Sequence, residues 1–226
     1  MVNFFVLLSL AGTLLMPSGI RQASSNQTHA GGSMIWEFDN LERIGGHKAT
    51  VLGNPVVIET EKGRAVAFDG TDDAIILDAN PLAGARQFTV EVIFRPDAGG
   101  PPEQRFLHMQ ETDDRRVLIE TRLTRDSRWF LDTFIKSDES EKTLYSERFP
   151  HPIGVWYLAA LVYQDNQMRH YINGAPELSG SVDYLPVQGG RTSIGCRLNR
   201  VFWFKGAIKR VRVTHRALSP REFMTL

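Results

Sequence analysis

Charged and aromatic side chains alternate with apolar ones between residues 88 and 136. Alternate residues of a β-strand share a face, so neighbouring strands here would gather polar groups on one side of a sheet. That face would carry Glu91, Arg95, His108, Gln110, Glu120, Arg122 and Asp132, with Phe106, Phe130 and Phe134 among them. Aromatic rings stack on sugars and polar side chains bind hydroxyl groups, which predicts a carbohydrate site. The alternative is an ordinary solvated face with cross-strand ion pairs.

Three of these residues, His108, Glu120 and Arg122, could instead catalyse cleavage of a polysaccharide. A histidine at the centre of a strand can act as a general base or acid near neutral pH. In a lyase, Arg122 and Gln110 would neutralise a uronate while His108 acts as the base. In a glycosidase, Glu91 and Glu120 would be the acid and base pair. Structural roles for His108 and Glu91 are the alternatives.

The elements that must position these residues are strands. Runs rich in aromatic and β-branched residues recur at the spacing of an all-β sandwich. They predict strands at 34–39, 49–52, 55–59, 64–68, 73–77, 87–95, 105–110, 115–123, 129–136, 143–148, 155–163, 167–172, 191–195 and 206–214. The stretch 156–177 is the most informative, because its two strands are joined by a polar turn and followed by Asn173-Gly174, a dipeptide that tolerates positive φ.

No segment of helical period and useful length interrupts these strands. The one helix signal is at 219–222, where Ser-Pro-Arg-Glu predicts a capping box that opens a short C-terminal helical turn. Many strands without crossover helices predict an antiparallel two-sheet sandwich.

Five motifs, in order, resemble laminin-G-like domains of the concanavalin A-like jelly-roll type. They are AVAFDGTDDAIIL, FTVEVIFRP, GVWYLAALVYQDNQMRHYINGAPE, TSIG and FKGAIKRVRVTHRALSPREF. The resemblance implies an all-β, concanavalin A-like jelly roll over residues 34–226. This fold hosts lectins, glycosidases, lyases and protein-binding modules. The glucanase members carry three closely spaced carboxylates on one strand, whereas residues 118–122 contain one.

In such a fold the segment 196–203 would lie at the rim of the sheet. Arg197, Asn199, Arg200 and Trp203 could bind an acidic or hydroxyl-rich ligand there, the arginines by forked hydrogen bonds. The alternative is that Trp203 packs as an edge plug. His170, in the hairpin at 156–177, is a further ligand candidate, although the register leaves its face open.

Calcium is the cofactor that the resemblance implies, because many laminin-G-like domains hold it. Asp69, Asp72 and Asp73 offer oxygen ligands for a hard cation in one tight turn. Capping of the turn by Asp side chains explains the same residues without a metal.

The net charge and the N-terminal segment indicate which further functions and locations the sequence favours. The formal net charge of zero argues against a general nucleic-acid binder. The apolar run 4–16 is shorter than the about 20 residues that span a bilayer. It therefore predicts a signal peptide at 1–23 and a flexible linker at 24–33, with no stable membrane insertion. A true start at Met34 is the alternative, and the oligomeric state stays open.

We therefore expect a secreted or periplasmic domain that binds a poly- or oligosaccharide on its concave sheet. A polysaccharide-cleaving enzyme and a protein-interaction module are the alternatives.

Overall fold

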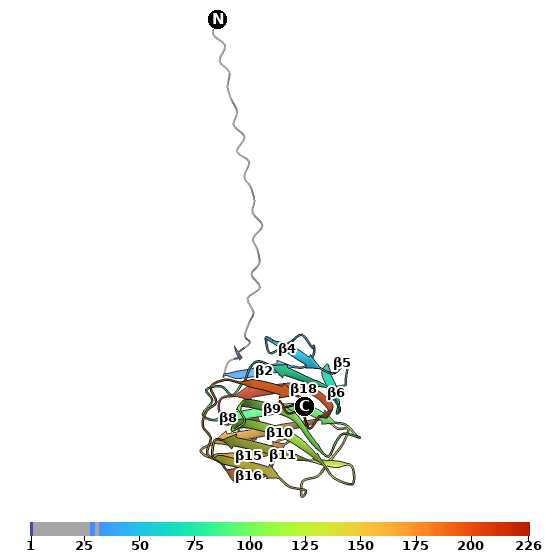
Figure 1. The fold of residues 1–226 in the computed structure, drawn as a ribbon, viewed down its shortest axis with the longest axis vertical. Coiled ribbons are helices and arrows are strands. Elements are labelled where there is room, and N and C mark those ends of the chain that lie inside the picture. The colour runs from blue at the N-terminus through green and yellow to red at the C-terminus, as the bar shows by residue number, and fades with distance from the viewer. Residues whose placement is uncertain (2–27, 30–31) are drawn as a thin grey trace.

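The computed structural model describes residues 1, 28–29 and 32–226. These residues form two antiparallel sheets around one core (Figure 1), which confirms the predicted all-β sandwich. Apart from Met1, the predicted signal peptide lies outside the described residues, as does most of the predicted linker. Within the described part of the chain, no helix is long and apolar enough to cross a membrane.

Each sheet has nine strands. Sheet 1 runs in the order β1 (Thr28–His29), β2 (Ser33–Glu37), β18 (Lys205–Thr214), β8 (Phe88–Pro96), β14 (Tyr157–Gln164), β15 (Gln167–Ile172) and β16 (Ala175–Ser181), with β6 (Ala65–Asp69) pairing β18 and β5 (Val56–Ile58) pairing β6. Sheet 2 runs in the order β12 (Ser140–Tyr145), β11 (Arg128–Ser137), β10 (Arg115–Leu123), β9 (Glu103–Thr112), β17 (Arg191–Ile194), β7 (Ala74–Leu77), β4 (His47–Leu52) and β3 (Arg43–Ile44), with β13 (His151–Pro152) pairing β11.

The core lies between the sheets and follows the alternation of the strands. On β8, the predicted apolar face of Phe88, Val90, Val92 and Phe94 points into the core. Phe94 meets Phe106 of sheet 2 with ring centroids 4.3 Å apart. Burial of such rings stabilises the sandwich by about 25 cal/mol per Å² of apolar surface.

The hairpin of β14 and β15 has the predicted turn chemistry. Asp165 and Asn166, which join the two strands, have φ of 50° and 59°. Asn173 and Gly174, which lead into β16, have φ of 51° and 80°. The Asn173 side chain also accepts a hydrogen bond from the backbone N–H of Leu158 at 2.9 Å. These residue types tolerate the left-handed region that such turns require.

The outer face of β9 differs from the prediction at one residue. Alternation places Phe106 on the outer face, whereas it is buried in the core. The register explains the difference, because Ile119 pairs with Leu107 but the next residue, Glu120, pairs with Arg105. Phe106 is thus the extra residue of a β-bulge, and the bulge turns Arg105 toward the outer face.

The C-terminal segment covers the outer face of sheet 1. It contains a short 3-10 turn, η1 (Pro220–Glu222), where the predicted capping box begins a helical turn. Leu218 and Phe223 pack on that face with Ile93, Trp156 and Tyr171 in a second apolar cluster. Sheet 1 is therefore covered on both faces at this place.

Candidate functional site

A row of charged side chains crosses three neighbouring strands on the outer face of sheet 2. Glu120 of β10 lies opposite Arg105 of β9 and opposite Asp132 of β11. Arg105 Nε is 2.9 Å from Glu120 Oε2, and Arg122 Nε donates to Asp132 Oδ2 at 2.7 Å. The two carboxylate side chains are only 4% and 1% exposed, so the row is largely buried.

This row forms the floor of a cavity of about 200 Å³, which we call the arginine cavity. Its lining residues are Arg105, Arg116, Leu118, Glu120, Arg122, Asp132, Phe134, Thr143 and Arg197. The structure thus brings together the predicted residues Glu120, Arg122, Asp132 and Arg197. Sequence reasoning missed Arg116, although continuing the alternation of Leu118 and Glu120 by one step would have found it.

Some of the buried polar atoms that lack a well-aligned hydrogen-bond partner belong to this row. Among the described residues, Arg105 Nε, Glu120 Oε2 and Asp132 Oδ1 are buried and make no such hydrogen bond. Nearly all buried polar atoms in proteins have a partner. Arg105 Nε and Glu120 Oε2 lie 2.9 Å apart as an ion pair, so of these three atoms Asp132 Oδ1 is left without a partner among the described residues.

Burial also perturbs the ionisation of the two carboxyl groups. The pKa of Glu120 is raised to about 7 by burial and by the neighbouring charge of Asp132, against the opposing effect of Arg105 and Arg122. Burial raises the pKa of Asp132 as well. Glu120 therefore holds a proton over part of the neutral range, as carboxyl groups at functional sites often do.

The loop 196–203 provides one wall of the cavity. Arg200 and Phe202 both have φ of 61°, which folds the loop tightly. The Phe202 carbonyl accepts the backbone N–H of Arg105 at 2.9 Å. The ring centroid of Phe202 lies 3.6 Å from the guanidinium carbon of Arg105. These contacts fix the loop on sheet 2 and place Arg197 at the cavity.

His108 lies beneath this loop and is fully buried. Its Nδ1 accepts the backbone N–H of Leu198 at 3.0 Å, so in the neutral ring the proton is on Nε2. Burial and the charges of Arg197, Arg116 and Arg105 lower the pKa of His108 to about 3. The expectation that His108 acts as a base is therefore wrong in this geometry, since it has no free lone pair and instead anchors the loop.

Glu91 and Arg95 do not belong to this face, because β8 lies in sheet 1. Glu91 Oε1 accepts the backbone N–H of Met224 at 2.6 Å, and its other oxygen pairs with Arg212. Arg95 forms two hydrogen bonds with Asp97, at 2.8 and 3.0 Å. Placing these two residues with Glu120 was wrong, because the chain passes from sheet 1 to sheet 2 between β8 and β9.

His170 faces the interior of the sandwich. Its Nδ1 lies 3.0 Å from Thr133 Oγ1 of the opposite sheet, and burial lowers its pKa to about 3. It is therefore a core histidine, and its assignment as a ligand residue is wrong.

The remaining candidates lie outside the lining of the cavity. Gln110 donates to Asp113 at 2.8 Å near the β9–β10 turn. Phe130 stacks on Tyr145 with ring centroids 6.4 Å apart. Asn199 is exposed and Trp203 is half-buried in the loop. None of these side chains lines the arginine cavity.

The carboxylates of Asp69, Asp72 and Asp73 place oxygen atoms within 4.8 Å of one another. Two of them already cap backbone groups. Asp69 Oδ1 accepts the N–H groups of Thr71 and Asp72 at 2.8 and 3.2 Å, and Asp73 accepts those of Asn54 and Asp69 at 2.5 and 3.0 Å. Oxygen ligands suit calcium, which takes six to eight of them, so the trio would supply part of a site.

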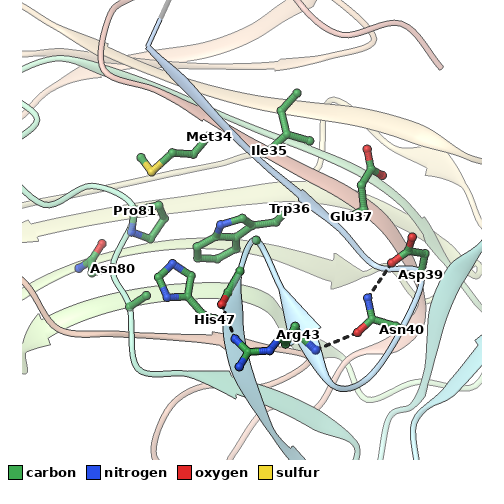
Figure 2. A pocket seen from close by; sticks show the side chains of 13 residues that line it. Met34, Ile35, Trp36, Glu37, Asp39, Asn40, Arg43, His47, Asn80 and Pro81 are labelled. Atoms are coloured by element: carbon green, nitrogen blue, oxygen red, sulfur yellow. Dashed lines mark hydrogen bonds between the residues drawn. The ribbon is translucent and has the colours of Figure 1, made fainter. Parts of the chain in front are cut away.

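A larger cavity, of about 510 Å³, lies at the β2–β4 end of the sandwich (Figure 2). Trp36 and His47 face one another there with ring centroids 6.2 Å apart. Sequence reasoning treated Trp36 only as a strand residue. Trp36 is just 3% exposed, which leaves little of its ring for stacking on a ligand. The arginine cavity, which gathers the buried ionisable groups, is therefore the candidate site.

Several solved structures share this fold at low sequence identity. One is domain 4 of AbnA, an extracellular GH43 arabinanase from Geobacillus stearothermophilus, in complex with arabinotriose. It is 18% identical, with a TM-score of 0.64 over 85% of this chain and 96% of that chain. Another is the binding domain of botulinum neurotoxin DC in complex with SialylT, 14% identical, with a TM-score of 0.63 over 87% of this chain and 50% of that chain.

A third is the heptameric SAP-like pentraxin from Limulus polyphemus, 18% identical, with a TM-score of 0.56 over 70% of this chain and 78% of that chain. No curated protein matches the chain. The model of the concanavalin A-like lectin/glucanases superfamily, Laminin_G_3, matches residues 69–223. That range includes every residue of the arginine cavity, and with its fold and motifs the chain belongs to this family.

Proposed function

We propose that the chain is a carbohydrate-binding domain whose ligand lies on the outer face of sheet 2, at the arginine cavity. The observation that carries this proposal is a pair of exposed aromatic rings beside the cavity. Tyr145 is 60% exposed and its ring centroid lies 5.9 Å from the guanidinium carbon of Arg122. Phe202 is 37% exposed and lies against Arg105. Such rings stack on the apolar faces of sugars.

The polar groups between these rings complement the hydroxyl groups of a sugar. Among the described residues, Asp132 Oδ1 makes no hydrogen bond, whereas Glu120 Oε2 is already paired with Arg105 Nε at 2.9 Å. The solved structures of the same fold support the proposal, because two of them are complexes with arabinotriose and with SialylT.

Affinity electrophoresis against neutral and acidic polysaccharides tests the proposal. Tyr145→Ala should weaken binding about 3- to 10-fold through loss of ring stacking. Leu185→Ala is the matched control, because Leu185 is 53% exposed and lies outside the cavity lining. Failure of the unmodified chain to bind any polysaccharide would overturn the proposal.

Cleavage of a polysaccharide is the second candidate function, and the raised pKa of Glu120 favours it. A carboxyl group with a pKa of about 7 can act as a general acid at neutral pH, with Asp132 as the neighbouring carboxylate. Glu91 cannot take part, because it lies in the other sheet. New reducing ends or unsaturated products from the unmodified chain, absent with Glu120→Gln, would establish cleavage. Binding without such products would exclude it for the polysaccharides tested.

We also propose that the protein is exported. The apolar run at residues 4–16 supports this location, and a structure of the same fold is a domain of an extracellular arabinanase. Expression with the native N-terminus and N-terminal sequencing of the product would test it. Retention of the whole chain in the cytoplasm would count against export.

A further inference from the structure

Two of the four arginines of the arginine cavity are neutralised by carboxylates. Arg105 lies 2.9 Å from both Glu103 and Glu120. Arg122 lies 2.6 Å from Glu103 and 2.7 Å from Asp132. These ion pairs hold both guanidinium groups on the sheet, so neither is free to bind an external anion without giving up a partner.

The other two arginines have no such partner. Among the described residues, no carboxylate lies within 4.0 Å of Arg116 or Arg197, and neither guanidinium makes a hydrogen bond. Arg116 instead lies over the ring of Phe134, 5.2 Å from its centroid. A guanidinium group has five N–H donors, so the cavity presents two guanidinium groups whose donors have no protein partner among the described residues.

These two cations also repel each other. Burial and the charge of Arg197 lower the pKa of Arg116, although more distant carboxylates partly oppose this effect. Arg116 comes from β10 and Arg197 from the loop 196–203, so two separate elements bring like charges to one small cavity. Such an arrangement destabilises the free protein, and an anion bound between the two groups would relieve it.

The balance of charge at the cavity also favours an anionic ligand. Four guanidinium groups face three carboxylates, those of Glu103, Glu120 and Asp132. Glu120 also carries a proton for part of the neutral pH range. The cavity therefore has surplus positive charge, whereas the chain as a whole has zero formal charge.

Resting on the proposed carbohydrate-binding function, we infer that the ligand is an anionic glycan whose carboxylate or sulfate group is held between Arg116 and Arg197. A carboxylate is planar and a sulfate is tetrahedral, and each can accept two hydrogen bonds from one guanidinium group. The volume of about 200 Å³ suits one acidic group with part of its sugar ring, while Tyr145 and Phe202 flank the continuing chain. This assignment replaces the prediction that Arg122 and Gln110 neutralise a uronate.

The test measures binding of the full chain to polygalacturonate (carboxylate), dextran sulfate (sulfate), and uncharged dextran and methyl-esterified pectin. Binding to a carboxylated or sulfated polymer is expected, with Arg116→Gln and Arg197→Gln each weakening it about 10- to 100-fold. The polymer that binds better identifies which oxyanion is preferred. Arg116→Lys should recover part of the affinity, because the charge remains but the fork is lost.

Arg43→Gln is the matched control, because it removes one arginine from the larger cavity and leaves the arginine cavity intact. It should bind like the unmodified chain, whereas an equal loss in Arg43→Gln would overturn the assignment. Thermal denaturation provides a second readout. Arg116→Gln should unfold at the same or a higher temperature, since it removes a repulsion, so its weaker binding would not reflect misfolding.

Two outcomes separate the inference from the function on which it rests. Binding to uncharged dextran or pectin that is unchanged in Arg116→Gln and Arg197→Gln would overturn the inference and leave the carbohydrate-binding function standing. Absence of binding to every polymer, charged or uncharged, would overturn the proposed function itself.

Discussion

Arg105 Nε and Glu120 Oε2 lie 2.9 Å apart on the outer face of sheet 2, with their side chains only 11% and 4% exposed. The bulge at Phe106 makes this contact possible, because it turns Arg105 away from the core and opposite Glu120. Arg105 thereby compensates the negative charge of the buried carboxyl groups of the row, and its guanidinium group also packs against the ring of Phe202. One side chain thus connects the sheet, the acidic pair and the loop.

Replacement of that side chain should be costly. Arg105→Met leaves Glu120 and Asp132 buried with less cationic compensation, and loses the contact with Phe202. We expect the free energy of unfolding, measured by urea denaturation at pH 7, to fall by about 3 kcal/mol. Arg64→Met is the control, because the Arg64–Glu59 pair is exposed and should contribute little. Equal effects of the two substitutions would show that the buried network does not stabilise the fold.

The buried histidines His108 and His170 should make the protein less stable in acid. Their pKa values are about 3 in the folded protein, below the usual 6.5. Between pH 6.5 and 3 the unfolded chain therefore binds protons that the folded chain does not, and stability falls as the pH is lowered. Each histidine contributes up to about 1.4 kcal/mol per pH unit. Urea denaturation from pH 7.5 to 4.5 should show a weaker dependence of stability on pH for His170→Gln than for the unmodified chain.

Glu120 should change the pH dependence of stability in the direction opposite to that of the buried histidines. Its pKa rises from 4.5 to about 7 on folding, so the folded chain binds the extra proton between these values. The contribution of Glu120 to the free energy of unfolding is therefore fully present below pH 4.5 and is lost as the pH rises through 7. Glu120→Gln removes the effect, and the rise of stability between pH 4.5 and 6.5 should become steeper. An unchanged profile would mean that Glu120 ionises as it does in the unfolded chain.

The glycine immediately before the loop 196–203, Gly195, should not tolerate a side chain. Gly195 has φ of 92°, and a Cβ atom there would lie 2.6 Å from the Phe68 ring and 2.8 Å from the Asp73 carbonyl oxygen. We expect Gly195→Ala to lower the free energy of unfolding by about 2 kcal/mol or more. Gly189→Ala is the control, because a Cβ atom at Gly189 would have no neighbour within 4 Å and the change should stay within about 0.5 kcal/mol.

The acidic turn allows a decision about calcium. Asp73 accepts backbone N–H groups of Asn54 and Asp69, so Asp73→Asn should lower stability with or without calcium. Urea denaturation in millimolar calcium and in EGTA distinguishes the two roles of the turn. An equal loss in both conditions indicates capping alone, and a loss that requires calcium indicates a metal site.

Local sequence signals predicted the scaffold well, because they depend on neighbouring residues only. The alternation of Phe88 to Phe94 and the positive φ of Asn173 and Gly174 are confirmed. Outer-face residues such as Glu120, Arg122 and Asp132 were also grouped correctly. Alternation assigns faces correctly as long as the ladder of hydrogen bonds is regular.

The errors arose where long-range information was needed. No local pattern announces the bulge at Phe106, so Arg105 was missed. The order of strands in the sheets depends on contacts distant in sequence, so Glu91 was assigned to the wrong sheet. His108 was expected to be accessible because the loop above it, anchored through Leu198, could not be placed from sequence.

The C-terminal residues act as a seal over hydrophobic surface. Arg212 donates to the Glu222 carbonyl at 2.7 Å, Glu91 accepts the Met224 N–H, and Phe223 meets Tyr171 with ring centroids 5.2 Å apart. Removal of residues 219–226 would expose the apolar cluster around Trp156 and leave a hydrophobic surface prone to self-association. Affinity tags and surface attachments for binding assays should therefore extend the C-terminus and never replace it.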